Sequence, residues 1–206
     1  GNTEVDEEGN TKSTVGAMRL KSVGKNLFDK NNAIIEGLAY NANASPRPYA
    51  YDKEKGIITV NNMVAFRGVG IKFRCIPGES YVVSWTSVTP PVAKRNAIQW
   101  YDANGNKVGE NRSLNVDHVS GTAPSGAVYG VGGMMSNTDG DSYSWKDIQV
   151  ERGDTATEYE PYTESNAYVV ATDPETGEIL EARSVPSGAK DEINVTDRKL
   201  IKRIGE

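Results

Sequence analysis

The sequence predicts an all-β fold built from short strands, either a sandwich or a barrel. Glycine occurs 21 times and tyrosine 10 times in 206 residues, and long apolar runs are rare, as in turn-rich β proteins. Apolar and polar residues alternate in short segments that are separated by turn signals. No segment repeats apolar residues every 3.6 positions over the length of a helix.

The strands follow one another at short spacing along most of the chain. The segments with strand character are 15–23, 57–60, 64–75, 81–86, 97–101, 127–135 and 143–151. In the third of these segments, Phe66, Ile71 and Phe73 supply the apolar positions. Between the strands, Pro77-Gly78 predicts a turn, and Asp102–Asn106 predicts a hairpin in which glycine supplies the positive φ.

The two ends of the chain differ from this middle part. Residues 1–13 are acidic and almost without apolar side chains, which is typical of a linker or a frayed hairpin. After Tyr162, two alternating segments flank a turn at 173–177 and predict a hairpin near 168–180. Because a two-stranded unit buries little surface alone, we expect it to pack on the sandwich, a neighbouring subunit or a further domain.

Composition excludes several classes of function. The formal charge of −5 and the lack of long basic clusters argue against a nucleic-acid partner. No apolar run approaches the roughly 18 residues of a membrane helix. The first residues carry no secretion signal, and the chain starts without Met, so we expect a fragment of a longer protein. The single cysteine, Cys75, excludes an internal disulfide and a multi-cysteine zinc site, and we expect it to be a packed thiol.

Several short phrases occur in a fixed order between residues 24 and 162. They are GKNLF at 24–28, PGESYVVS at 77–84, YDANGN at 101–106, TAPSGAVY at 122–129, QVERG at 149–153 and ATEYEPY at 156–162. Each phrase alone is ordinary turn chemistry. Together they closely resemble the jelly-roll, carbohydrate-binding-type modules in tail-tip and baseplate proteins of phages and prophages of Gram-positive hosts.

This resemblance implies a domain organisation. Residues 24–161 would form a jelly-roll β-sandwich of the galactose-binding or carbohydrate-binding-module type. Residues 1–23 would be a linker with one edge strand, and 162–206 a β connector to a missing downstream domain. The segment 183–205 is similar to the LRSLPNGVKDEI…RIG connector of such proteins, and it departs at Val185 and at 187–189.

The resemblance also implies a function. The module would be non-catalytic and would bind host cell-wall polysaccharide, with weak single sites multiplied by many copies on one virion. It would be made in the bacterial cytoplasm without a signal peptide. It would contact other tail subunits and could form a homo-oligomer through the connector. The alternative is a structural spacer or oligomerisation module that binds no glycan. A charge of −5 suits neutral glycans better than anionic teichoic acids.

Residues for catalysis are not apparent in the sequence. Carboxylates are numerous, but none sits in a recognisable catalytic phrase for glycan hydrolysis. The only histidine, His118, lies in a polar segment without a nucleophile elbow. We therefore expect no enzymatic activity.

Sugar binding requires a ring beside polar side chains, because sugars present both C–H faces and hydroxyls. The three tryptophans Trp85, Trp100 and Trp145 are expected in the core, as most strand tryptophans are. Alternation separates Trp100 from Gln99 and Tyr101, although it leaves open which face of the sheet binds. The candidate ligand-binding residues are Arg67, Arg95, Gln99, Tyr101, Arg112 and Tyr129.

One structural calcium ion is a further expectation. Asp102–Asn106 and Asp139–Asp141 place oxygen ligands near glycine, but they lack the spacing of an EF-hand, and turns that use Asx side chains explain them better. The resemblance implies a Ca²⁺ site between the start of the module and its last strand. Its expected ligands are Asp147, Glu36 and backbone groups of residues 31–36.

Overall fold

The chain divides into two compact units, residues 24–163 and the flanking segments 1–23 with 164–206. The computed structural model describes residues 3–5, 11–13, 19–39, 48–172, 175–176 and 179–184. Nearly all the regular structure is antiparallel strand, and the described helical element is one short 3-10 turn, η1 (Lys30–Asn32). Among these residues no helix is long and apolar enough to span a bilayer.

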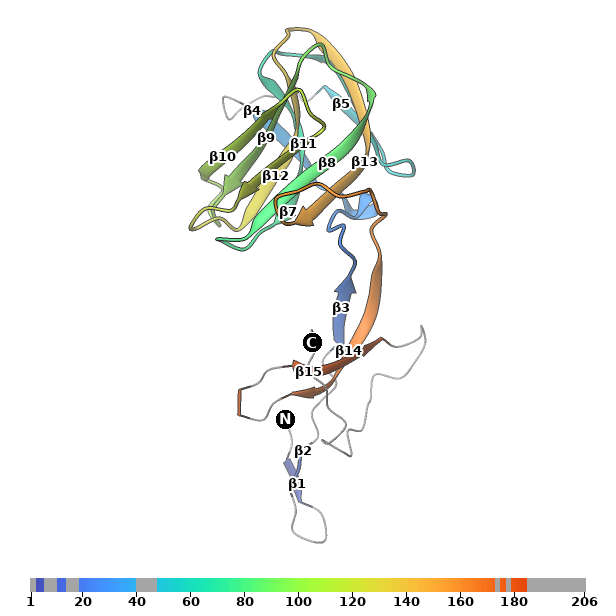
Figure 1. Ribbon diagram of the computed structural model, residues 1–206, viewed down its shortest axis with the longest axis vertical. Helices are drawn as coiled ribbons and strands as arrows, with labels where there is room; N and C mark the ends of the chain where they lie inside the picture. Colours follow the sequence, from blue (N-terminus) through green and yellow to red (C-terminus); the bar gives the residue numbers. More distant parts are fainter. Residues whose placement is uncertain are drawn as a thin grey trace. The chain divides into compact units, whose positions relative to one another are not determined.

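Residues 24–163 form a β-sandwich of two five-stranded antiparallel sheets (Figure 1). The front sheet has the order β10 (Lys107–Leu114), β9 (Lys94–Tyr101), β12 (Tyr129–Ser136), β7 (Arg67–Arg74) and β4 (Ile35–Ala39). The back sheet has the order β11 (His118–Thr122), β8 (Ser80–Thr89), β13 (Asp141–Arg152), β6 (Ile57–Met63) and β5 (Tyr49–Asp52). Most consecutive strands change sheet, as in a jelly roll. The predicted all-β jelly-roll class is confirmed.

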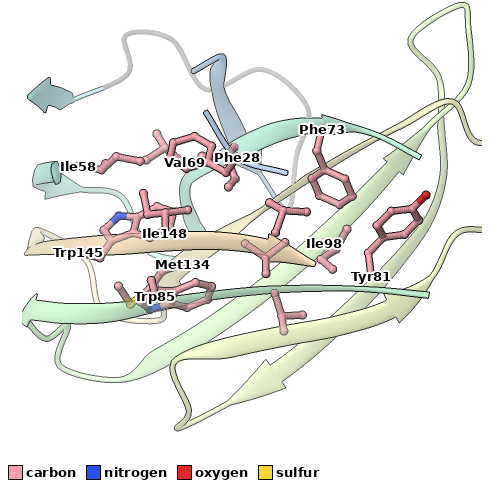
Figure 2. Packing of buried hydrophobic residues seen from close by; sticks show 14 of the residues in the cluster. Phe28, Ile58, Val69, Phe73, Tyr81, Trp85, Ile98, Met134, Trp145 and Ile148 are labelled. Carbon is pink, nitrogen blue, oxygen red and sulfur yellow. The ribbon is translucent and has the colours of Figure 1, made fainter. Parts of the chain in front are cut away.

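The core lies between the two sheets. Trp85 and Trp145 meet edge to face there, with ring centroids 5.1 Å apart (Figure 2). Phe73 packs edge-on against Trp100 at 5.8 Å. All three tryptophans are buried, which confirms the prediction that they belong to the core. Rings of this size remove much apolar surface from water and stabilise the sandwich together with the buried isoleucines and valines around them.

The structure corrects some of the expected strand pattern. Phe66 was assigned to the apolar face of a strand with Ile71 and Phe73, but it precedes β7 and is 43% exposed. Its φ of +61° is not that of an extended strand. In a continuous strand, Phe66 would also lie on the opposite face from Ile71 and Phe73, because it lies an odd number of positions away from each of them. The edge strands β4, β5 and β11 were not expected, and β10 was implied only by the hairpin predicted at Asp102–Asn106, because the side chains of these strands alternate weakly between apolar and polar.

The start and the end of the sandwich are fastened to each other by Asn26. Its side-chain amide donates to the carbonyls of Ile148 and Glu160, at 3.1 and 2.9 Å. Its side-chain oxygen accepts from the backbone N–H groups of Phe28 and Val150, at 2.9 and 3.1 Å. Asn26 is almost fully buried, and this one side chain satisfies four backbone groups, three of them in buried hydrogen bonds.

Two buried polar residues of β13 complete this arrangement. Gln149 donates to the carbonyls of Thr157 and Glu158 and accepts from the N–H of Glu160 at 2.9 Å. Glu151 accepts from both the backbone N–H and the hydroxyl of Thr157. We call Asn26, Gln149, Glu151 and residues 157–160 the terminal clasp. The opening and closing phrases of the sequence are therefore explained by structural contacts.

The other unit contains short strand pairs. β1 (Thr3–Val5) pairs with β2 (Thr11–Ser13), and β14 (Glu164–Thr172) lies between β15 (Ile179–Ser184) and β3 (Arg19–Val23). The expected C-terminal hairpin is thus confirmed as β14 and β15, and β3 adds a third strand to it. The connector sequence from Val185 onward, including 199–203, lies outside the described residues.

Candidate functional site

Strand alternation creates a second row of side chains on the side of the front sheet that faces away from the core. We call this side the outer face. Its residues include Glu36 and Leu38 of β4, Lys72 of β7, Arg95, Ala97, Gln99 and Tyr101 of β9, Glu110 and Arg112 of β10, and Tyr129, Val131 and Met135 of β12. Five of the six predicted ligand-binding residues belong to it.

The centre of the outer face is apolar. Leu38, Ala97, Val131 and Met135 form a small buried cluster of their own, separate from the main core. Tyr101 and Tyr129 pack against this cluster and remain half-buried. Because the floor is closed to solvent, a ligand on this face would contact the tyrosines and the polar residues around them.

The two tyrosines form a stacked pair. They are directly opposite each other in the register of β9 and β12, so their side chains leave the sheet together. Their ring centroids are 5.1 Å apart, with an interplanar angle of 12°. The ammonium group of Lys72 lies 4.2 Å from the centroid of the Tyr129 ring, within the range of a cation–π contact.

A chain of hydrogen bonds runs from this pair across β9 to β10. The Tyr101 hydroxyl donates to Gln99 Oε1 at 3.0 Å, and Gln99 Nε2 donates to Glu110 Oε2 at 3.2 Å. Glu110 also forms ion pairs with Lys107 and Arg112. Burial acts to raise the pKa of Glu110, but its hydrogen bonds from the two basic residues outweigh burial and hold the pKa below its usual range. Glu110 is therefore an ionised acceptor at neutral pH.

The charges on the outer face are mixed in sign. Burial raises the pKa of Tyr101, and the neighbouring Tyr129, Glu36 and Glu110 raise it further. The hydroxyl therefore stays protonated and can donate a hydrogen bond throughout the physiological pH range. Glu36 lies 3.6 Å from Lys72. The face thus offers neutral donors and acceptors beside paired charges.

Two of the predicted arginines differ in their placement. Arg95 lies on the outer face, with its guanidinium carbon 5.1 Å from the centroid of the Phe66 ring. Its buried Nε has no hydrogen-bond partner among the described residues. Arg67, at the start of β7, has the same phase as Val69 and Ile71, which belong to the core. Alternation therefore does not bring Arg67 to the outer face.

The two residues proposed to bind calcium lie on different sheets. Glu36 is on β4 of the front sheet, where it pairs with Lys72. Asp147 sits in a bulge of β13 with a φ of +49°. No group of three His, Cys, Asp or Glu side chains able to hold a metal occurs among the described residues. Asp102 accepts from the N–H groups of Asn104 and Asn106, as a turn residue does. The calcium site stays a prediction.

The candidate site also includes three charged residues that contact its other side chains: Lys72, Glu36 and Glu110. Of these, only Glu36 was predicted from the sequence, and it was predicted as a metal ligand. Lys72 sits on β7, whose partners β4 and β12 are far from it in sequence, whereas Glu110 sits on β10, which pairs with the preceding strand β9. Only the register, which places Gln99 opposite both Glu110 and Val131, brings them together. The polar segment 107–114 gives no signal of a strand by apolar alternation.

The chain is an antiparallel β-sandwich protein whose outer face groups aromatic rings with amide, carboxylate and basic side chains. No family model and no curated protein matches it. Solved structures that resemble it include the enzymatically active domain of tailspike protein 4 from bacteriophage CBA120, with a TM-score of 0.36 and 10% identity. That match covers 68% of this chain and 20% of the tailspike chain.

Two further solved structures concern carbohydrate-active proteins. One is a two-module fragment of endo-1,4-beta-D-xylanase 10B from Clostridium thermocellum, complexed with xylohexaose. It matches with a TM-score of 0.33 and 11% identity, and the match covers 70% of this chain and 27% of the xylanase chain. A carbohydrate-binding module of the beta-sandwich superfamily matches with a TM-score of 0.31 and 14% identity, covering 72% and 61%. The chain spans less than two thirds of each matched chain, and these identities carry no function over to it.

Proposed function

We propose that residues 24–163 form a non-catalytic carbohydrate-binding module of a phage or prophage tail protein, located in the virion. The module binds host cell-wall polysaccharide through the outer face of the front sheet. The observation that carries this proposal is the stacked pair of Tyr101 and Tyr129 beside Gln99 and Glu110. The ordered phrases from residue 24 to 162 support the phage context by resemblance.

The chemistry of the outer face suits a sugar. A sugar ring presents an apolar C–H face to an aromatic ring and its hydroxyls to amides and carboxylates. Tyr101 supplies the ring and the ionised Glu110 accepts from hydroxyl groups, while the buried Gln99 holds these two residues in place. Since Tyr101 and Gln99 already bond to each other, their positions are fixed before a ligand arrives, which reduces the entropy lost on binding.

Binding to purified Gram-positive cell walls and to a glycan array tests the proposal. We expect the wild-type chain to bind a wall polysaccharide and Tyr101→Ala to weaken that binding about tenfold, a loss of about 1.4 kcal/mol. Val92→Ala is the control, because Val92 is 76% exposed and lies outside both the outer face and the terminal clasp. Binding to no wall fraction, or equal binding by Tyr101→Ala and the wild type, would contradict the proposal.

A structural spacer is the alternative, and one observation favours it. The N–H of Gly24 donates to the carbonyl of Thr163 at 2.9 Å, so the two ends of the sandwich are side by side. A module with adjacent ends can be placed within a longer chain without interrupting it. In this reading the flanking strands hold subunits together. A wall-binding wild-type chain whose mass in solution is that of a monomer would argue against the spacer.

A further inference from the structure

One end of the sandwich carries a depression of about 650 Å³ whose charged lining residues are all basic. Lys72 and Arg74 lie on β7, Arg152 ends β13, and Tyr129 begins β12. We call this depression the basic pocket. Its volume is in the range of about 300–1,000 Å³ that is typical of small-molecule sites.

The cations of the basic pocket are poorly neutralised. No aspartate or glutamate is among its described lining residues. Lys72 has one carboxylate neighbour, Glu36, at 3.6 Å. Arg74 and Arg152 are exposed and form no ion pair with any described residue. In a chain with a formal charge of −5, such a group of cations produces a local positive potential that opposes the net charge.

The rest of the pocket lining is largely apolar, and three of its aliphatic side chains are accessible. Leu27, Ile76 and Val128 are 36%, 49% and 43% exposed. Tyr129 belongs both to this pocket and to the stacked pair on the outer face. The pocket and the outer face are therefore continuous through Tyr129 and Lys72, and one extended ligand could contact both.

We propose that the basic pocket binds an oxyanion, a phosphate or a carboxylate, carried by a sugar unit of the glycan that lies on the outer face. This rests on the proposed function and adds that the glycan is anionic. Guanidinium groups match both oxyanions, because their N–H donors form paired, charge-assisted hydrogen bonds with them. The apolar side chains around Arg74 and Arg152 fit the C–H surface of the same sugar.

Titration of the full chain with three small probes tests the charge preference. The probes are glucose 1-phosphate, glucuronic acid and glucose, and NMR chemical-shift changes give the affinities. We expect at least one charged probe to bind about tenfold or more tightly than glucose and to shift signals of Tyr129 and Arg74. The probe with the higher affinity distinguishes phosphate from carboxylate. Raising the salt from about 50 to 300 mM should weaken only the charged probes.

A double variant with a matched control locates the effect. Arg74→Gln with Arg152→Gln should lower the affinity for the charged probe at least about tenfold and leave glucose unchanged. Lys146→Gln removes an exposed cation of β13 outside the basic pocket and should change neither affinity. Both arginines are exposed, so the double variant should unfold at the wild-type temperature, which a thermal melt checks.

The only cysteine of the chain gives an independent readout. Cys75 lines the basic pocket, and burial raises the pKa of its thiol. Alkylation by iodoacetamide at pH 8.5 should proceed slowly, and a saturating charged probe should slow it further. Glucose at the same concentration should not protect the thiol. Protection by the charged probe that is lost in the double arginine variant places the probe in this pocket.

The failures of the two proposals are distinguishable. If the wild-type chain binds wall glycans but shows no preference for a charged probe, the anionic ligand is excluded and the binding module stands. The same holds if the preference survives in the double arginine variant. If the chain binds no wall glycan and no probe, both proposals fail.

Discussion

At the residue scale, the structure separates side chains that hold the fold from those available to a ligand. Asn26 illustrates the first kind. Three of its hydrogen bonds join the start of the sandwich to its end, and the fourth closes the turn at Phe28. Tyr101 illustrates the second, since its ring and hydroxyl lie on the partly exposed outer face. The two residues therefore differ in role chiefly because Asn26 is buried and Tyr101 is partly exposed.

Replacing Asn26 by alanine should destabilise the sandwich strongly. The change leaves two carbonyls and two N–H groups without their partner, three of them buried, which should lower the free energy of unfolding by about 3 kcal/mol. Urea unfolding measures the loss. Asn61→Ala, at an exposed position of β6, should change stability by less than about 0.5 kcal/mol. Equal effects of the two variants would show that the terminal clasp does not stabilise the fold.

Tyr51 should make stability sensitive to alkaline pH. Burial of the ring, with the negative charges of Asp29 and Asp52, raises its pKa from 10.0 to about 12. The fold therefore favours the neutral tyrosine, so its contribution is complete below pH 10 and disappears as the pH rises towards 12. Thermal melts at several pH values from 8 to 12 should show this decline.

Tyr51→Phe is the matching variant for the pH experiment. It lacks the hydrogen bond from the Tyr51 hydroxyl to the Lys30 carbonyl, which is 2.5 Å long, and should be less stable than the wild type at pH 8. Because phenylalanine does not ionise, its melting temperature should then fall less steeply above pH 10. If the melting temperatures of the two proteins fall in parallel above pH 10, the loss of stability at alkaline pH comes from other tyrosines.

At the element scale, strands with clear alternation were predictable and edge strands were not. The segment 57–60 pairs with Tyr143 and Trp145 on β13 and buries Ile58 and Val60, as its pattern predicts. β10 shows no such pattern, because it is an edge strand with polar residues on both sides. The outer face depends on it, so the ion pairs of Glu110 could not be foreseen from the sequence.

β12 is a central strand despite its glycines, which usually weaken strands. The reason is close packing: a Cβ on Gly133 would lie 2.4 Å from the carbonyl oxygen of Val69 and 2.7 Å from the Cα of Gly70. Gly133→Ala should therefore lower the free energy of unfolding by about 2 kcal/mol through overpacking. In Gly24→Ala the only short contact is to the Thr163 hydroxyl, which can rotate, so the loss should be smaller. Urea unfolding compares them, and equal stabilities would contradict this account.

At the scale of the whole molecule, the sandwich has the organisation of an inserted domain. β3 ends at Val23 and β14 begins at Glu164, and these two strands pair with each other. Between them, the Gly24–Thr163 hydrogen bond and the terminal clasp close the sandwich on itself. We therefore expect its stability not to require the flanking strands.

A fragment of residues 24–163 should fold and bind alone. Its core, both sheets and the terminal clasp are complete within these limits, so one cooperative transition should remain, within a few degrees of the sandwich transition in the full chain. Its affinity for a soluble glycan should equal that of the full chain, because the outer face is contained in it. If residues outside the fragment join copies together, the full chain should bind immobilised cell walls more tightly than the fragment does, because linked sites bind the same surface at once. Calorimetry, equilibrium binding and mass in solution separate these properties, and an unfolded fragment would show that the flanking strands are part of one folding unit.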